Sequence, residues 1–245
     1  MDQGIYTAAA GARAMEDQLA VISNNIANTS TTGFKKDAIV FEQFAKDLDT
    51  AQLSPGQYRR TPVDVIARQY YIDLSQGSYK KTGRELDLAM VGDGFFVVQT
   101  QDGDRFTRSG SFMISPEGVL VNAQGHSVQG QSGEITLGAG RVKVDPSGTV
   151  SLNGATVDVL NIVNVSGADL VRAADGLFTA REGVVPERIE SPIIEQGSLE
   201  MSNVEPIKEM VGLINTQRAY EAFQKVIRSF DTTYSQSISS IGETE

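Results

Sequence analysis

The chain has 245 residues, of which 40% are hydrophobic, no cysteine, and a formal net charge of −10 at pH 7. This length allows one large domain or two small ones, and the composition is sufficient for a hydrophobic core. The absence of cysteine excludes disulfides and thiolate chemistry, and the acidic charge argues against a nucleic-acid binder, which usually carries a basic face.

Apolar residues recur every three or four positions from the N-terminus and predict a helix over about residues 2–28. Asp2 can cap the start of this helix, and Gly33 can adopt the left-handed conformation that ends one. A stripe this narrow is typical of helices that pack against another helix. The stripe consists of Ile5, Ala8, Ala12, Met15, Leu19, Ile22 and Ile26.

The N-terminus lacks the basic start and compact apolar stretch of a cleaved secretory signal. No apolar run along the chain approaches the roughly 18 residues that a membrane-spanning helix needs. We therefore expect no membrane span. If the protein leaves the cytoplasm, we expect a route that reads no removable peptide.

Residues 34–85 predict a connector of mostly extended chain. Ile39, Val40, Phe41, Phe44 and Leu48 fit either a short helix or an extended arm. Beyond them, Ser54-Pro55-Gly56 indicates a turn, and alternating apolar residues over 63–65 and 70–74 indicate strands. A second extended connector is expected over 184–200.

Between the connectors, residues 86–183 predict an all-β domain, because turn residues interrupt short apolar runs at close intervals. Three hairpins are expected, over 95–108, 111–122 and 142–152. Residues 157–165 predict one longer, central strand. Turns this closely spaced favour a small barrel or sandwich.

A second apolar stripe predicts a C-terminal helix that begins after Asn203, with Asn203 as its cap and Pro206 in its first turn. The stripe shifts its register before Tyr220. Its members are Ile207, Val211, Ile214, Tyr220, Phe223, Ile227, Phe230, Tyr234 and Ile241.

The expected fold class is therefore α+β. The terminal helices, residues 1–33 and 201–245, are expected to pair as an α-helical coiled-coil domain, joined by the extended connectors to the central all-β domain. A single pair of helices cannot cover all of its apolar surface, and isolated helices are marginal in water. We therefore favour packing between subunits, although such stripes also occur inside ordinary domains.

Few residues suggest catalysis. His126, the only histidine, lies in a turn-rich stretch and is interpreted as a loop residue. Two carboxylate pairs, Glu85 with Asp87 and Glu187 with Glu190, fit the acid and base of glycoside cleavage. However, the chain has no tryptophan to form a platform for a sugar. We expect neither an enzyme nor a cofactor or metal site.

Several motifs, in order along the chain, resemble those of the bacterial flagellar rod and hook proteins. The N-terminal motif is SNNIANTSTTGFK at 23–35. The β-domain motifs are GDGFFVV at 92–98, FTRSGSF at 106–112 and GVLV at 118–121. The C-terminal motifs are QGSLEMSNV at 196–204 and QRAYE at 217–221.

The resemblance implies a structural subunit of the basal-body rod, most similar to the F-type proximal-rod proteins, with G-type distal-rod and hook-type proteins as alternatives. Such subunits stack helically around a channel with the terminal helices innermost. The implied partners are other rod subunits and the flagellar type III export apparatus, and the implied location is the periplasmic rod. A secreted β domain that binds cell wall or carbohydrate is the alternative from another class. We expect polar contacts that set the register between subunits at Asn24, Asn25, Asn28, Gln217 and Arg218.

Overall fold

The computed structural model describes residues 2–43 and 66–242 and divides the chain into two compact units. Unit 1 comprises Met1–Ile26, Asp37–Tyr70 and Pro206–Glu245, and unit 2 comprises Ala27–Lys36 and Tyr71–Glu205. A helix lies at each end of the chain and strands fill its middle, which confirms the α+β class.

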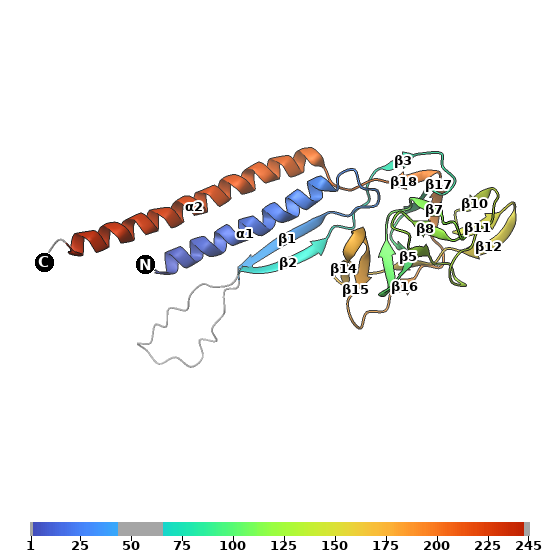
Figure 1. Cartoon of the computed structure of the whole chain (residues 1–245), viewed down its shortest axis with the longest axis horizontal. Coiled ribbons are helices and arrows are strands. Elements are labelled where there is room, and N and C mark those ends of the chain that lie inside the picture. Colours follow the sequence, from blue (N-terminus) through green and yellow to red (C-terminus); the bar gives the residue numbers. More distant parts are fainter. Residues whose placement is uncertain (1, 44–65, 243–245) are drawn as a thin grey trace. The chain divides into compact units, whose positions relative to one another are not determined.

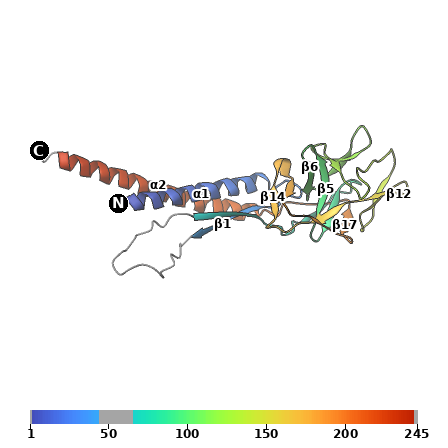
Figure 2. The same ribbon diagram turned by 90° about the horizontal axis from the view of Figure 1, so that it is seen from below.

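Unit 1 contains the two long helices, α1 (Asp2–Ala27) and α2 (Pro206–Gly242). Its strands, β1 (Asp37–Gln43) and β2 (Ile66–Ile72), form a two-stranded sheet. Figures 1 and 2 show α1 and α2 side by side, with the N- and C-termini at the same end of the pair. The helix predicted over 2–28 is confirmed.

The start of α2 differs from the prediction. The helix begins at Pro206, where a missing N–H costs no hydrogen bond, rather than just after Asn203. The Asn203 side chain is used elsewhere: its Nδ2 donates to the Asp73 carbonyl (2.8 Å) and its Oδ1 accepts from the Lys36 amide (2.8 Å). The assignment of Asn203 as the helix cap was wrong for this reason.

The first connector is extended where the structure describes it. Ile39, Val40 and Phe41 lie in strand β1, so the extended alternative holds for them, and Tyr70 and Ile72 lie in β2. Leu74 follows the end of β2. The remaining predictions for this connector fall outside the described residues, namely those for Phe44, Leu48, Ser54-Pro55-Gly56, Val63 and Val65.

Unit 2 consists of short strands and one 3-10 turn, η2 (Ala174–Gly176). The strands are β3 (Tyr79–Lys81), β4 (Leu88–Val91), β5 (Phe95–Thr100), β6 (Gly103–Thr107), β7 (Phe112–Ile114), β8 (Leu120–Asn122), β9 (Ser127–Val128), β10 (Val142–Val144), β11 (Thr149–Leu152), β12 (Ala155–Val159), β13 (Ile162–Asn164), β14 (Leu170–Arg172), β15 (Phe178–Ala180), β16 (Glu187–Arg188), β17 (Ile193–Gln196) and β18 (Ser198–Glu200).

The largest sheet runs in the order β14-β15-β6-β5-β9-β8-β7, with β13 paired to β5 and β16 paired to β13. Strands β10-β11-β12 form a second sheet, and β17-β4 and β18-β3 form two small ones. Among the described strands, β14 and β7 remain the two ends of the large sheet, so it does not form a closed barrel.

The three predicted hairpins are confirmed as the antiparallel pairs β5–β6, β7–β8 and β10–β11. The single strand predicted over 157–165 is wrong, because β12 and β13 belong to different sheets. The break falls at Leu160 and Asn161, whose amides bind the carbonyls of Gly148 and Gln129 (2.9 Å each). Backbone partners from distant turns therefore interrupt a run that its own side chains favour as a strand.

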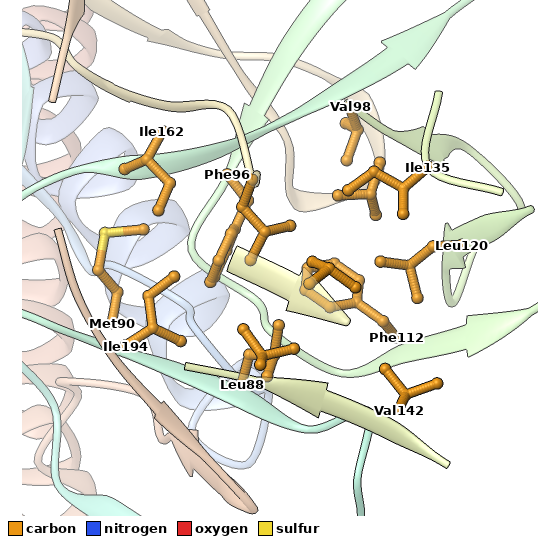
Figure 3. Close-up of a cluster of buried hydrophobic side chains, with 14 of the residues drawn as sticks. Leu88, Met90, Phe96, Val98, Phe112, Leu120, Ile135, Val142, Ile162 and Ile194 are labelled. Carbon is orange, nitrogen blue, oxygen red and sulfur yellow. The ribbon is translucent and has the colours of Figure 1, made fainter. Parts of the chain in front are cut away.

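The hydrophobic core of unit 2 has two clusters of side chains. The larger one, shown in Figure 3, draws on β4, β5, β7, β8, β10, β13 and β17, and includes Leu88, Phe96, Phe112 and Ile194. The Phe96 and Phe112 rings meet edge to face, 5.2 Å between centroids. The smaller cluster contains Phe95 and residues from β6, β14 and β15. Each large side chain buried here contributes about 1.5–3 kcal/mol before ordering entropy is subtracted.

The turn between β10 and β11 is held by Asp145 and gives this unit an acid-sensitive element. Its Oδ1 accepts hydrogen bonds from the Ser147 hydroxyl (2.6 Å), the Ser147 amide (2.9 Å) and the Thr149 amide (3.0 Å). The Ser147 hydroxyl is the main cause that lowers the pKa of Asp145 below its ordinary value near 3.8.

A lowered carboxyl pKa stabilises the folded state above the unfolded pKa, and this contribution is lost as the pH falls through the folded pKa. We therefore expect Asp145→Asn to show a weaker loss of stability below pH 3.8 than the unaltered chain. Urea midpoints measured from about pH 5 to about pH 2 test this. Parallel acid curves for the two proteins would contradict it.

Candidate assembly interface

The two helices of unit 1 pack antiparallel through glycines. The Phe223 ring of α2 lies over Gly11 of α1, where a Cβ atom would come within 2.5 Å of the ring. Phe230 lies over Gly4 in the same way, with 2.7 Å from such a Cβ to the ring. At the other end, Ile22 of α1 faces Gly212, where a Cβ atom would lie 3.6 Å from its Cδ1. The absent side chains leave room for large apolar groups of the opposite helix.

Most of the stripe predicted on α1 is covered within unit 1. Ala8, Ala12 and Ile22 are buried, and Ile5, Met15, Leu19 and Ile26 are partly buried. Ala14, which the stripe omits, is also buried. This face of α1 therefore contributes to the interior of the subunit.

The stripe predicted on α2 divides into two parts. Its later residues Tyr220, Phe223, Ile227, Phe230 and Tyr234 are partly buried, and the side chain of Ile241 lies outside the described residues. Its earlier residues are exposed: Ile207 by 79%, Val211 by 54% and Ile214 by 52%. Met210, which is not part of the predicted stripe, is exposed by 52%. We call Ile207, Met210, Val211 and Ile214 the outer stripe.

The outer stripe and the seam towards α1 lie on opposite sides of α2. Nine positions separate Ile207 from the buried Thr216, and nine separate Ile214 from Phe223. At about 3.6 residues per turn, nine residues make two and a half turns, a rotation of about 180°. The register shift in the sequence therefore marks the change from an outward apolar face to an inward one. After Ile214 the outward face carries exposed polar and charged residues, Arg218, Glu221 and Lys225.

The five polar candidates have different surroundings. Asn25 is only 2% exposed, and its amide group exchanges two hydrogen bonds with the backbone of Asp37, both 2.9 Å. Its side chain is therefore committed within unit 1. Asn28 accepts a hydrogen bond from the Thr31 hydroxyl (3.1 Å) in the turn after α1. The other three, Asn24, Gln217 and Arg218, are exposed on the helices.

A buried ion cluster in unit 2 joins parts of three motifs. Glu200 Oε1 lies 2.8 Å from Lys35 Nζ, and Glu200 Oε2 lies 2.5 Å from Arg108 Nε. All three side chains are almost fully buried. Lys35 Nζ also donates to the carbonyls of Leu74 (3.2 Å) and Ser75 (2.7 Å). Burial, the largest influence, lowers the pKa of Lys35 from its ordinary value near 10.5, while the hydrogen bond and charge of Glu200 act in the opposite direction.

The guanidinium of Arg108 binds the backbone that precedes β5. Its two terminal nitrogens donate to the carbonyls of Met90 (2.9 Å), Gly92 (2.5 Å) and Gly94 (2.5 Å). No local pattern in the sequence singles out Lys35, Arg108 or Glu200 as members of a site. The available signal was that each lies inside a stretch that resembles the rod proteins, at 23–35, 106–112 and 196–204.

The carboxylates Glu85 and Asp87 do not form the acid and base pair that was considered for them. Glu85 is exposed and lies 3.4 Å from Arg141, whereas Asp87 is 1% exposed, so the two carboxylates do not face solvent together. Within residues 2–43 and 66–242, no three His, Asp or Glu side chains could together hold a metal ion. Neither helix, as far as the structure describes it, is long and apolar enough to cross a membrane.

An amphipathic helix pair with a second, exposed apolar stripe is typical of structural subunits that pack against other chains. Known families agree with this class. The family described as "Flagella basal body rod protein" matches residues 5–35, "Flagellar hook protein FlgE/F/G D1 domain" matches 89–152, and "Flagellar basal body rod FlgEFG protein C-terminal" matches 195–240.

Curated relatives cover almost the whole chain. The flagellar basal-body rod protein FlgF of Caulobacter vibrioides is 36% identical, over 93% of this chain and 93% of its own length. FlgF of Salmonella typhimurium is 35% identical over 94% and 95%, and the rod protein FlgG of Bacillus subtilis is 29% identical over 94% and 96%. The chain therefore belongs to the flagellar basal-body rod protein family and is of the F type. This family is structural, which confirms the prediction that the chain is not an enzyme.

Proposed function

We propose that the chain is a subunit of the proximal rod that stacks helically with other rod subunits through its terminal helices. The observation that carries this proposal is the outer stripe. A helix already packed on one side leaves four large apolar side chains exposed on the opposite side. Apolar surface of this kind on a soluble protein typically marks a contact with another chain.

The size of the stripe argues for an array rather than an isolated pair. Ile207 to Ile214 spans only two turns of helix, whereas a stable two-protein interface buries roughly 800 Å² on each partner. A single contact of this size is too weak to hold two subunits. Repeated contacts of one surface with a different one on the next subunit add up and generate an open helical assembly. We therefore expect the protein to be a monomer in dilute solution and to assemble only together with the other rod subunits.

Family membership and the contacts between α1 and α2 support the remaining parts of this proposal. The terminal helices, residues 1–33 and 201–245, form the assembly domain and pair as a coiled coil. Residues 34–85 and 184–200 link the assembly domain to the β domain at 86–183, which is built as a sandwich of sheets. The strands β3, β17 and β18 of these linking stretches pair within unit 2. The subunit passes through the flagellar type III export apparatus, surrounds the export channel in the periplasm and transmits torque.

Two matched substitutions on α2 test the proposal. Val211 lies in the outer stripe, and Val226 is an exposed valine of the same helix (43%) outside the stripe. We expect Val211→Asp to abolish incorporation into basal bodies and swimming, since burying an unpaired carboxylate in an interface costs several kcal/mol. Val226→Asp should assemble normally. Both variants should keep the circular dichroism and melting temperature of the unaltered chain.

Basal bodies isolated from cells that express each variant, probed for the subunit, provide the measurement. Normal incorporation of Val211→Asp would remove the outer stripe from the assembly interface. Equal loss in both variants would show a general intolerance of charge on α2 and would also contradict the proposal.

A further inference from the structure

Residues 32–36, which we call the strap, are bound within unit 2 through hydrogen bonds to segments that are distant in the sequence. The Gly33 amide donates to the Glu200 carbonyl (2.8 Å), and the Lys36 carbonyl accepts from the Asp73 amide (3.0 Å). The Lys36 amide is bound by the side chain of Asn203. Backbone hydrogen bonds therefore hold the strap at Gly33 and at Lys36.

The middle of the strap is held by cations. Arg172 donates to the Lys35 carbonyl (2.6 Å) and stacks over the Phe34 ring, 4.6 Å from its centroid. The Lys35 side chain enters the buried ion cluster, where Glu200 binds it. At Gly33 a Cβ atom would run into the backbone of Arg108 and Ser109, so the strap lies directly against the segment that follows β6.

Neither of the two hydrophobic core clusters includes a residue of the strap. The two core clusters of the described chain contain residues from 72 to 194, and none from 27–36 or 198–205. The strap is held by hydrogen bonds, by the Lys35–Glu200 ion pair and by the stacking of Arg172 on Phe34, a side chain that is buried (6% exposed) outside the two clusters. Regions of this kind open at lower free energy than the core that they cover.

We propose that the buried ion cluster is a latch that holds the strap closed, and that loss of the Glu200 charge opens the strap without unfolding the β core. Glu200 is the shared anion because its two oxygens bind Lys35 and Arg108 separately. Arg108 keeps the carbonyls of Met90, Gly92 and Gly94 when Glu200 is neutral, so the core side of the latch stays in place.

The latch also requires a complete unit 2. Lys35 and Glu200 are 165 residues apart in the sequence. A chain that lacks residues 198–203 would leave two buried cations without a counter-charge, which is strongly unfavourable. The chain leaves unit 2 after Lys36 and again after Glu205. The latch joins Lys35, which adjoins Lys36, to Glu200, which lies shortly before Glu205. The latch therefore connects, within unit 2, the two segments that lie just before the points where the chain leaves this unit.

The charges allow a test that separates a latch from ordinary packing. Two cations and one anion give the cluster a net charge of +1. Glu200→Gln raises this to +2, Lys35→Met lowers it to 0, and the double variant Lys35→Met/Glu200→Gln restores +1. If charge controls the strap, the double variant must be less open than Glu200→Gln alone.

Hydrogen–deuterium exchange on the full chain provides the measurement, with the exposed Glu190→Gln as the control of equal charge change. In Glu200→Gln we expect peptides over 31–37 and 198–204 to exchange at least about tenfold faster, while peptides over β5 and β6 keep their rates. The double variant should recover part of this protection, and Glu190→Gln should match the unaltered chain.

Three results would overturn the latch. One is an equal rise in exchange over the strap and over β5–β6, which indicates general destabilisation. Another is no change at 31–37 in Glu200→Gln. The third is a double variant more open than Glu200→Gln. If Glu200→Gln does not fold, Lys35→Met serves in its place: faster exchange confined to 31–37 supports the latch, and unchanged or uniformly faster exchange rejects it.

Discussion

Replacing Arg108 by methionine is expected to lower the free energy of unfolding of unit 2 by about 3–5 kcal/mol. Methionine fills a similar length but donates no hydrogen bond. The carbonyls of Gly92 and Gly94 and one oxygen of Glu200 would then lose the donor that Arg108 supplies, whereas the Met90 carbonyl would keep the Tyr79 hydroxyl (2.9 Å). Unsatisfied buried acceptors carry the full cost of their desolvation.

Urea unfolding of the full chain, followed by a probe of β structure, measures this loss. Arg108→Lys should fall between the two proteins, because an ammonium group cannot reach the same acceptors with the fork geometry of a guanidinium. The exposed Arg188→Met is the matched control and should leave the midpoint unchanged. A midpoint for Arg108→Met equal to that of the control would show that the cluster contributes nothing to stability.

Replacing Gly11 by leucine is expected to separate the two helices of unit 1 at a cost of about 1–3 kcal/mol. Leucine favours helix over glycine by almost 1 kcal/mol, so helix propensity alone would give the opposite sign. The loss comes from the Phe223 ring, which occupies the position of the new side chain. The exposed Ala9→Leu on the same helix should not produce it.

Thermal melting of helical circular dichroism measures this effect, and a compensating change sharpens the test. Phe223→Ala removes the ring that clashes, so the pair Gly11→Leu/Phe223→Ala should lose less stability than the two single changes summed. Simple additivity of the two losses would mean that the ring and the glycine do not share one contact.

The sequence predicted the elements whose signals are local. A period of three and four residues identified both helices, and turn residues such as Asp102-Gly103 placed the three hairpins. Periodicity does not reveal which side of a helix is covered. For this reason the outer stripe and the seam of α2 were assigned to one interface, and Met210 was left out.

Signals that depend on distant partners could not be extracted from the sequence. Lysine, arginine and glutamate are usually exposed, so nothing local marked Lys35, Arg108 and Glu200 as buried. Asparagine usually caps a helix or faces solvent, yet the side chains of Asn25 and Asn203 both bind backbone groups elsewhere in the chain. The interruption after Val159 likewise depends on the carbonyls of Gly148 and Gln129.

Because α2 has two opposed faces, the number of residues between Ile214 and Tyr220 sets the angle between the outer stripe and the seam. Removing one residue there would turn the whole first part of the helix by about 100° against the second and leave every side chain otherwise unchanged. Adding seven residues would nearly restore the angle, because seven is close to two full turns. The phase of the helix, rather than the identity of the intervening residues, would then decide the direction in which the subunit meets its neighbour.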